Sequence, residues 1–256
     1  MSEGSQINIS YPDAVDRQLK ITVGACRLKI KPGDGEAWIE GVYRDPSNSL
    51  PAKVVQEGPT VRISQAPEWA NVFNLPSGFP AFDLSLGKAR PFALTVESGA
   101  SDNEIDLGGV PISRLAIKQG AGKMVIDFSA PNPEAMSMLG LGAGAGGVEV
   151  RNLANANFAE MTAEGGAVAY QLDFGGVLQR NAHVRVSTGM ASVEIRVPAS
   201  TASKIYTESV LGSLDVGDGF TKKEGAFWTS AALVGGAPVL TIHANAALGS
   251  LSLRVT

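Results

Sequence analysis

The chain has 256 residues, of which 44% are hydrophobic and 18% are charged, and its 25 acidic and 21 basic side chains give a formal net charge of −4. This composition excludes a disordered tail, and the mild acidity argues against a nucleic-acid-binding surface, which depends on neutralising phosphates with basic residues. The single cysteine, Cys26, has no partner for an intramolecular disulfide. A chain of this length can bury a core without one.

The first ten residues carry no Lys or Arg, and the first basic residue is Arg17. A secretory leader needs a basic start followed by an apolar run, so none is expected here. For the sequence as written we therefore expect a cytoplasmic location, with the cell envelope as the alternative if a leader or anchor has been removed.

Residues 1–90 are expected to form an N-terminal β portion. Apolar and polar residues alternate over residues 19–30 and again over residues 82–86, which is typical of half-buried strands. Residues 66–79 contain prolines and have no clear period, which indicates a connecting loop. Trp69 in this loop is a candidate contact residue, because connecting loops often carry function.

Residues 91–256 contain a repeat with a period of 21 to 24 residues, and five consecutive units share it. Each unit has two alternating apolar segments, which predict two short strands, with a small-residue turn between them. The glycines at equivalent positions of the five units are Gly99, Gly120, Gly144, Gly166 and Gly189. A glycine at each corner indicates either a positive φ or a close approach to the neighbouring unit.

A unit of this size cannot bury its apolar face alone, so successive units must stack on one another. The expected fold is all-β: a β-solenoid of stacked 21–24-residue coils with the N-terminal β portion packed onto it. We expect the division to fall at residue 90, with residues 91–256 forming the solenoid. Only residues 12–18 and 133–139 are expected to form helical turns.

Short motifs rich in small residues resemble a known family. They are Gly24-Ala25-Cys26-Arg27-Leu28 followed by residues 36–43, Gly120-Ala121-Gly122 before a strand, and Leu248-Gly249-Ser250-Leu251. Because these motifs occur in this order and with the period of the repeat, the chain resembles the toast-rack β-solenoid domains. It is similar to the C-terminal domain of LiaF-type envelope-stress regulators and to adhesin-type head domains. The resemblance implies a non-enzymatic β-solenoid and supplies no catalytic residues. LiaF-type proteins have membrane helices before this domain, and the sequence shows none, which argues against a membrane-anchored regulatory role.

The sequence indicates no nucleotide site and no zinc site. Residues 142–147 match G-x-G-x-x-G, the dinucleotide fingerprint, but Val148-Glu149-Val150 begins a strand where that motif needs a helix N-terminus. The two histidines, His183 and His243, are expected to face solvent, and they have no zinc-ligand spacing with Cys26. We therefore expect no cofactor and no metal.

Paired carboxylates are the remaining route to catalysis, because glycan-cleaving enzymes use two of them. Glu104 and Asp106 are expected to point outward, and Val125 takes the place of Glu104 in the next unit, so no acidic ladder persists. Weak Ca²⁺ binding by the turns at Asp102 and Asp218 is an alternative to ordinary solvated turns. We expect no catalytic residues.

Residues 226–253 form the longest uncharged stretch. Polar residues, glycines and a proline interrupt it, so it predicts a strand rather than a membrane helix. If residues 240–255 form the open end of the stack, their unpaired edge favours self-association; the alternative is that the N-terminal portion covers this coil. The candidate interaction residues are Trp69, Thr241, His243 and Ser252.

We therefore expect a non-catalytic scaffold or interaction module that binds a protein partner or itself, without nucleic acid, nucleotide or a membrane span. The alternative is an envelope glycan-binding or glycan-degrading protein. A third interpretation is a filament assembled by end-to-end stacking of solenoids.

Overall fold

The protein consists almost entirely of β-structure. The computed structural model describes residues 4–46, 50–65 and 79–256. Strands make up 67% of the residues and helices 4%, which confirms the all-β expectation. The two expected helical turns are not helical, and the short helices lie instead at η1 (Leu153–Ala156) and α1 (Ser230–Val234).

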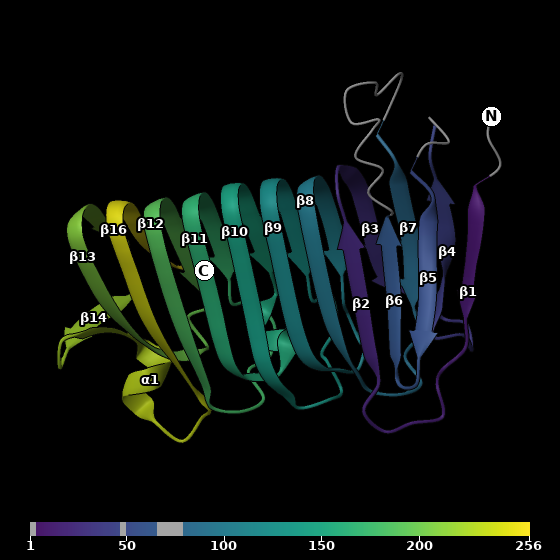
Figure 1. Ribbon diagram of the computed structural model, residues 1–256. Helices are drawn as coiled ribbons and strands as arrows, with labels where there is room; N and C mark the ends of the chain where they lie inside the picture. The colour runs from purple at the N-terminus through teal and green to yellow at the C-terminus, as the bar shows by residue number, and fades with distance from the viewer. Residues whose placement is uncertain (1–3, 47–49, 66–78) are drawn as a thin grey trace.

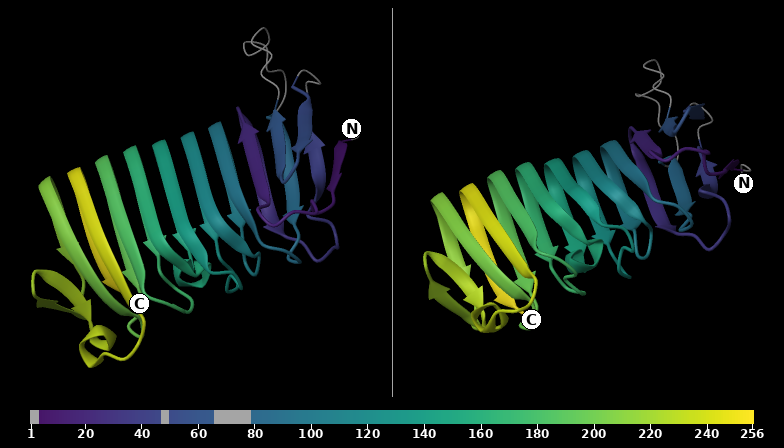
Figure 2. Two further views of the ribbon diagram at one scale, coloured as in Figure 1. Left: turned by 60° about the horizontal axis from the view of Figure 1, so that its bottom comes forward. Right: turned by 90° about the horizontal axis from the view of Figure 1, so that it is seen from below.

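Seven long strands of 15 to 17 residues lie side by side as a stack of coils (Figure 1). They are β8 (Phe92–Asp106), β9 (Ile112–Asp127), β10 (Met136–Arg151), β11 (Phe158–Asp173), β12 (Ala182–Val197), β13 (Ala202–Val216) and β16 (Val239–Val255). Each strand is continuous through the corner, where the sequence indicated two short strands. It bends there, so that every coil has a first arm before the corner and a second arm after it (Figure 2).

The pairing between coils confirms the sequence repeat. Leu94 lies opposite Leu115, and Leu115 lies opposite Leu139 in the next coil. Met161 and Val184 continue the same row. All five side chains are buried. Because neighbouring coils run parallel, equivalent apolar positions stack into continuous rows, and each coil stabilises its neighbours.

The last strand of the chain is not the last strand of the stack. β16 pairs in parallel with β12 on one side and with β13 on the other, so β13 ends the stack (Figures 1 and 2). The expectation that residues 240–255 form an open end is therefore wrong. A hairpin of β14 (Phe220–Lys223) and β15 (Ala226–Thr229), followed by α1, connects β13 to β16. In the described parts of the chain, no helix is long and apolar enough to cross a membrane.

The N-terminal strands continue both arms of the stack beyond β8. β2 (Gln18–Val23) pairs with the first half of β8, and β3 (Cys26–Pro32) pairs with its second half, both in parallel. The first arm continues as β6 (Thr60–Gln65) and β5 (Ala52–Glu57). The second arm continues as β7 (Ala81–Leu86), β4 (Ile39–Arg44) and β1 (Ser5–Ile9). The N-terminal β portion is thus hydrogen-bonded to the solenoid, and the division at residue 90 stays a prediction.

A close approach between coils explains the corner glycines. A Cβ on Gly120 would lie 3.1 Å from the carbonyl oxygen of Gly99, and one on Gly144 would lie 2.5 Å from that of Gly120. Positive φ occurs two residues further on, at Gly122 and Gly146, and not at the corner glycines themselves. The close approach to the neighbouring coil therefore explains why glycine occupies the corner position. A positive φ does not explain it.

Buried asparagines join the connections at the base of the stack. Asn132 is fully buried, and its side-chain amide donates to the carbonyl oxygens of Ile112 and Ala156 at 2.9 and 3.1 Å. Its Oδ1 accepts hydrogen bonds from the backbone N–H groups of Ile112 and Glu134 at 3.3 and 2.9 Å. One side chain therefore satisfies buried backbone groups from three successive connections, as buried polar groups require.

Candidate functional site

The arms and the corner give the stack three long surfaces. Outward side chains of the first arm form one face, those of the second arm form the other face, and residues beside the corner form the edge between them. Thr241 and His243 of β16 lie on the first-arm face, whereas Ser252 of β16 lies on the second-arm face. The structure does not bring these three residues together, and Trp69 lies outside the described residues.

His243 lies in a cluster of polar and aromatic side chains on the first-arm face. Tyr206 of β13 is its cross-strand neighbour, and the two rings stack with their centroids 4.7 Å apart. Arg185 of β12 lies opposite His243 on the other side. Together with Glu208 and Asn245, these residues line a shallow hollow of about 250 Å³. His243 is exposed, as the sequence indicated, and the cluster offers hydrogen-bond donors and acceptors.

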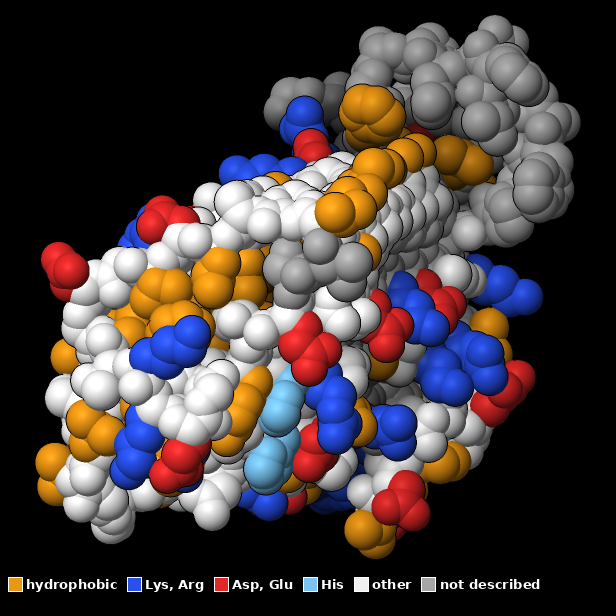
Figure 3. All heavy atoms as spheres, turned by 90° about the vertical axis from the view of Figure 1, so that its left-hand side faces the viewer, with side chains coloured by type: hydrophobic (Ala, Val, Ile, Leu, Met, Phe, Trp, Pro, Cys, Tyr) orange, Lys and Arg blue, Asp and Glu red, His pale blue; other side chains and the backbone are white. Residues whose placement is uncertain are grey.

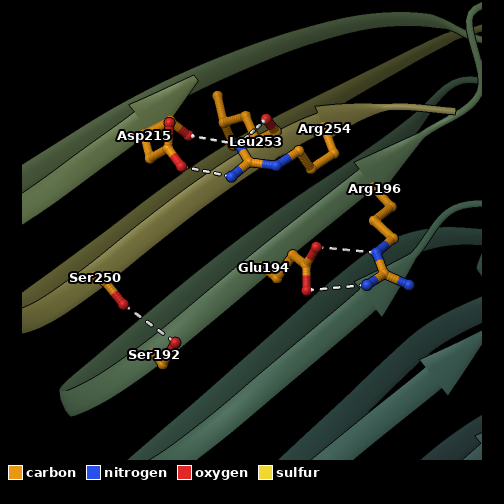
Figure 4. A network of polar contacts seen from close by, with 7 residues as sticks. All are labelled: Ser192, Glu194, Arg196, Asp215, Ser250, Leu253 and Arg254. Carbon is orange, nitrogen blue, oxygen red and sulfur yellow. Dashed lines mark hydrogen bonds and ion pairs between the residues drawn. The ribbon is translucent and has the colours of Figure 1, made fainter. Parts of the chain in front are cut away.

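Ser252 lies on the second-arm face. Figure 4 shows the charged pairs on this face. The cross-strand neighbours of Ser252 are Glu194 on one side and Asp215 on the other. Glu194 accepts two hydrogen bonds from Arg196 at 3.0 and 3.1 Å, and Arg254 forms an ion pair with Asp215. An arginine therefore neutralises each carboxylate beside Ser252.

An apolar ridge follows the corner along the stack, and Figure 3 shows it running away from the viewer. It consists of the exposed residues beside the corner in seven successive coils: Ala100, Ala121, Ala145, Ala167, Met190, Leu248 and Leu211. The side chains become larger toward β13, where those of Met190 and Leu211 are 64% and 70% exposed. Exposed large apolar side chains that adjoin one another mark an interaction surface.

The β13 end of the stack has an incompletely paired edge. β13 pairs with β16 along one side and, among the described residues, with β15 only at Lys204 and Ile205 along the other side. Leu214 lies opposite the buried Leu251, yet it is 43% exposed because no further coil covers it. A free strand edge next to exposed apolar side chains is a template for pairing with another strand.

Burial changes the reactivity of Cys26 and Tyr170. Burial raises the pKa of the Cys26 thiol to about 12, so the thiol is protonated at neutral pH and is a poor nucleophile. Burial also raises the pKa of Tyr170, whose hydroxyl donates a hydrogen bond to the backbone oxygen of Glu164 at 2.6 Å. Across the described residues, no group of three His, Cys, Asp or Glu side chains could hold a metal ion.

The other motifs that the sequence singled out are structural. Residues 142–147 lie within β10, so no helix begins after these glycines. Glu104 is exposed and lies opposite Val125, so the carboxylates form no continuous ladder there. Trp38 and Trp228 are also buried, so neither side chain is exposed for contact with a ligand.

Sequence reasoning missed three surface residues: Tyr206, Leu211 and Met190. Met190 directly follows the corner glycine Gly189, where the preceding units have Ala, so the increase in size was visible in the repeat. Tyr206 and Leu211 gain their significance only from the position of β13 at the end of the stack, which the repeat does not reveal.

These features define a β-solenoid of parallel coils. The family model of the N-terminal domain of toast_rack, DUF2154, matches residues 1–151, and the chain belongs to this family. The resemblance found in the sequence is thereby confirmed. No curated protein matches the chain.

Two solved structures are similar to the chain at low sequence identity. A "putative cell adhesion protein" from Clostridium sporogenes ATCC 15579 is 15% identical, with a TM-score of 0.54 over 99% of each chain. A "putative lipid binding protein" from Parabacteroides distasonis ATCC 8503 is 12% identical, with a TM-score of 0.42 over 97% of this chain and 96% of that one. At 15% identity, the likeness to the cell adhesion protein is one of fold alone.

Proposed function

We propose that the protein is a non-catalytic interaction module that binds a second copy of itself through the β13 end of the stack. One observation carries this proposal: the free edge of β13 lies beside Leu211, which is 70% exposed, and Leu214, which is 43% exposed. Pairing with a strand of a second copy would satisfy the backbone groups of this edge and bury both leucines.

Charge near the second-arm half of this edge does not oppose such contact. Asp215 is the acidic residue of this half of β13, and its ion pair with Arg254 offsets its charge. Leu211 also continues the apolar ridge through Leu248 and Met190, so a partner strand would meet an apolar surface on both sides of the corner.

Light scattering coupled to size-exclusion chromatography tests this proposal. We expect the protein to be a dimer or larger at high protein concentration. Leu211→Lys should return it to a folded monomer with an unchanged circular-dichroism spectrum, because an exposed charge at the edge blocks strand pairing without disturbing the core. The control is Val177→Lys, at an apolar residue that is 61% exposed on a connection between coils, and it should leave the oligomer intact. A monomeric wild-type protein, or equal disruption by both variants, contradicts the proposal.

A further inference from the structure

A row of charged side chains crosses the second-arm face near the N-terminal end of the stack, far from β13. On neighbouring strands it consists of Arg44 of β4, Arg27 of β3, Asp102 of β8 and Lys123 of β9, with Ala81 of β7 between the two arginines. These residues line a hollow of about 620 Å³ in this face. The small side chain of Ala81 leaves open space between the two arginines.

The row has unbalanced positive charge. Further from the corner along the same strands, Lys29 pairs with Glu104 at 3.2 Å and Lys31 pairs with Asp83 at 3.8 Å, so those charges cancel. In contrast, the side chains of the three cations in the row, Arg27, Arg44 and Lys123, form no ion pair with any described residue. Asp102 is the one acidic residue of the row, and its Oδ1 accepts a hydrogen bond from the backbone N–H of Lys123 at 3.4 Å.

The spacing of the cations indicates the shape of the ligand. They occupy every second strand, and adjacent strands lie about 4.8 Å apart, so neighbouring cations are separated by about 10 Å along the axis of the stack. A linear polyanion lying along this axis would meet one cation at each such step. Successive pyranose units of an extended glycan advance by a distance close to one strand spacing, so the row suits a glycan with an acidic group on every second sugar.

We infer that this row binds a linear acidic polysaccharide. In such a glycan a neutral sugar alternates with each acidic one, and Asp102 lies between two of the cations, where its carboxylate can accept hydrogen bonds from the hydroxyls of the neutral sugar. The carboxylate of each acidic sugar would lie against Arg27, Arg44 or Lys123. Guanidinium groups bind carboxylates through paired hydrogen bonds, which favours arginine at two of the three positions.

Isothermal titration calorimetry of the full chain with a hyaluronan octasaccharide, which carries a carboxylate on every second sugar, tests the inference. We expect binding that weakens steeply as salt is added, since the contacts are ionic. The double variant Arg27→Gln/Arg44→Gln should bind about tenfold or more weakly, because both charge-assisted contacts are lost. A neutral chitin oligosaccharide should not bind.

The control variant is Arg62→Gln, at an exposed arginine of β6 on the first arm, and its affinity should stay within about twofold of wild type. Absence of hyaluronan binding, or an equal loss in the control variant, would overturn the inference. Equal binding of poly-glutamate would assign the row to acidic peptides and would also overturn it. The double variant should keep the melting temperature and the oligomeric state of the wild type, so the outcome is independent of the β13 contact.

Discussion

Replacing Asn132 by Ala is expected to lower the free energy of unfolding by about 3–5 kcal/mol. The amide makes four hydrogen bonds to backbone groups of Ile112, Glu134 and Ala156, all at the base of the stack. Asn132 is fully buried, so water cannot replace the lost amide, and each backbone group left without a partner costs about 1–3 kcal/mol. The N–H of Ile112 keeps a hydrogen bond to the oxygen of Val110 at 2.9 Å, so the loss falls on the other groups. Urea-induced unfolding followed by circular dichroism measures the change.

The matched control is Asn181→Ala. Asn181 also bridges two segments through its amide, because its Oδ1 accepts a hydrogen bond from the backbone N–H of Val239 at 2.8 Å, but it is exposed. Water can take the place of the lost oxygen, so the cost should stay below about 1 kcal/mol. If the two variants lose the same stability, the buried amide of Asn132 does not hold the coils together as described.

The coils could be predicted from the sequence, because the alternation of apolar and polar residues and the length of the repeat each follow from a physical requirement of a stack. Each arm must turn one side toward the core, and each coil must present the same side as its neighbour. The rows that contain Leu94 and Leu115 therefore followed from spacing alone. The asparagines did not, because a polar residue in a connection looks like an ordinary solvated turn until the next connection is known to cover it.

The order of β13 and β16 could not be predicted from the period, since both strands fit the same repeat and either could follow β12. The inward residues nevertheless carry a signal. β16 turns Leu240 and Ala244 toward the core, and their partners in β13 are Ser203 and Thr207. The more polar of the two strands lies at the end of the stack, where part of its inner side is uncovered.

Three of the candidate contact residues, Thr241, His243 and Ser252, were chosen on the assumption that β16 was the end strand. In the structure β12 and β13 flank these three residues on both sides. The charged row was also hidden in the sequence, because Arg44 and Lys123 are 79 positions apart and meet only through the pairing of β4, β7, β3, β8 and β9. Long-range strand order, and not local pattern, assembles the sites of this fold.

Two adjacent glycines beside the corner, Gly146 and Gly147, test how closely neighbouring coils pack. Gly146 has φ of +121°, and a Cβ there would lie 2.0 Å from the carbonyl oxygen of Gly122 in the preceding coil. Both the backbone conformation and the contact oppose any other residue, and the carbonyl cannot move freely because its coil is paired on both sides. Gly146→Ala is therefore expected to lower the free energy of unfolding by about 2–4 kcal/mol, measured by urea denaturation.

Gly147 is the control for Gly146, since it is the next residue of the same strand. A Cβ on Gly147 would meet no atom within 4 Å, and its φ lies outside the left-handed region. Gly147→Ala should change stability by no more than about 0.5 kcal/mol, and a slight gain is expected because alanine restricts the unfolded chain. The difference between the two variants isolates the close contact of the coils from the general cost of losing a glycine. If Gly146→Ala melted at the same temperature as Gly147→Ala, the coils could not be packed as closely at this position as the structure shows.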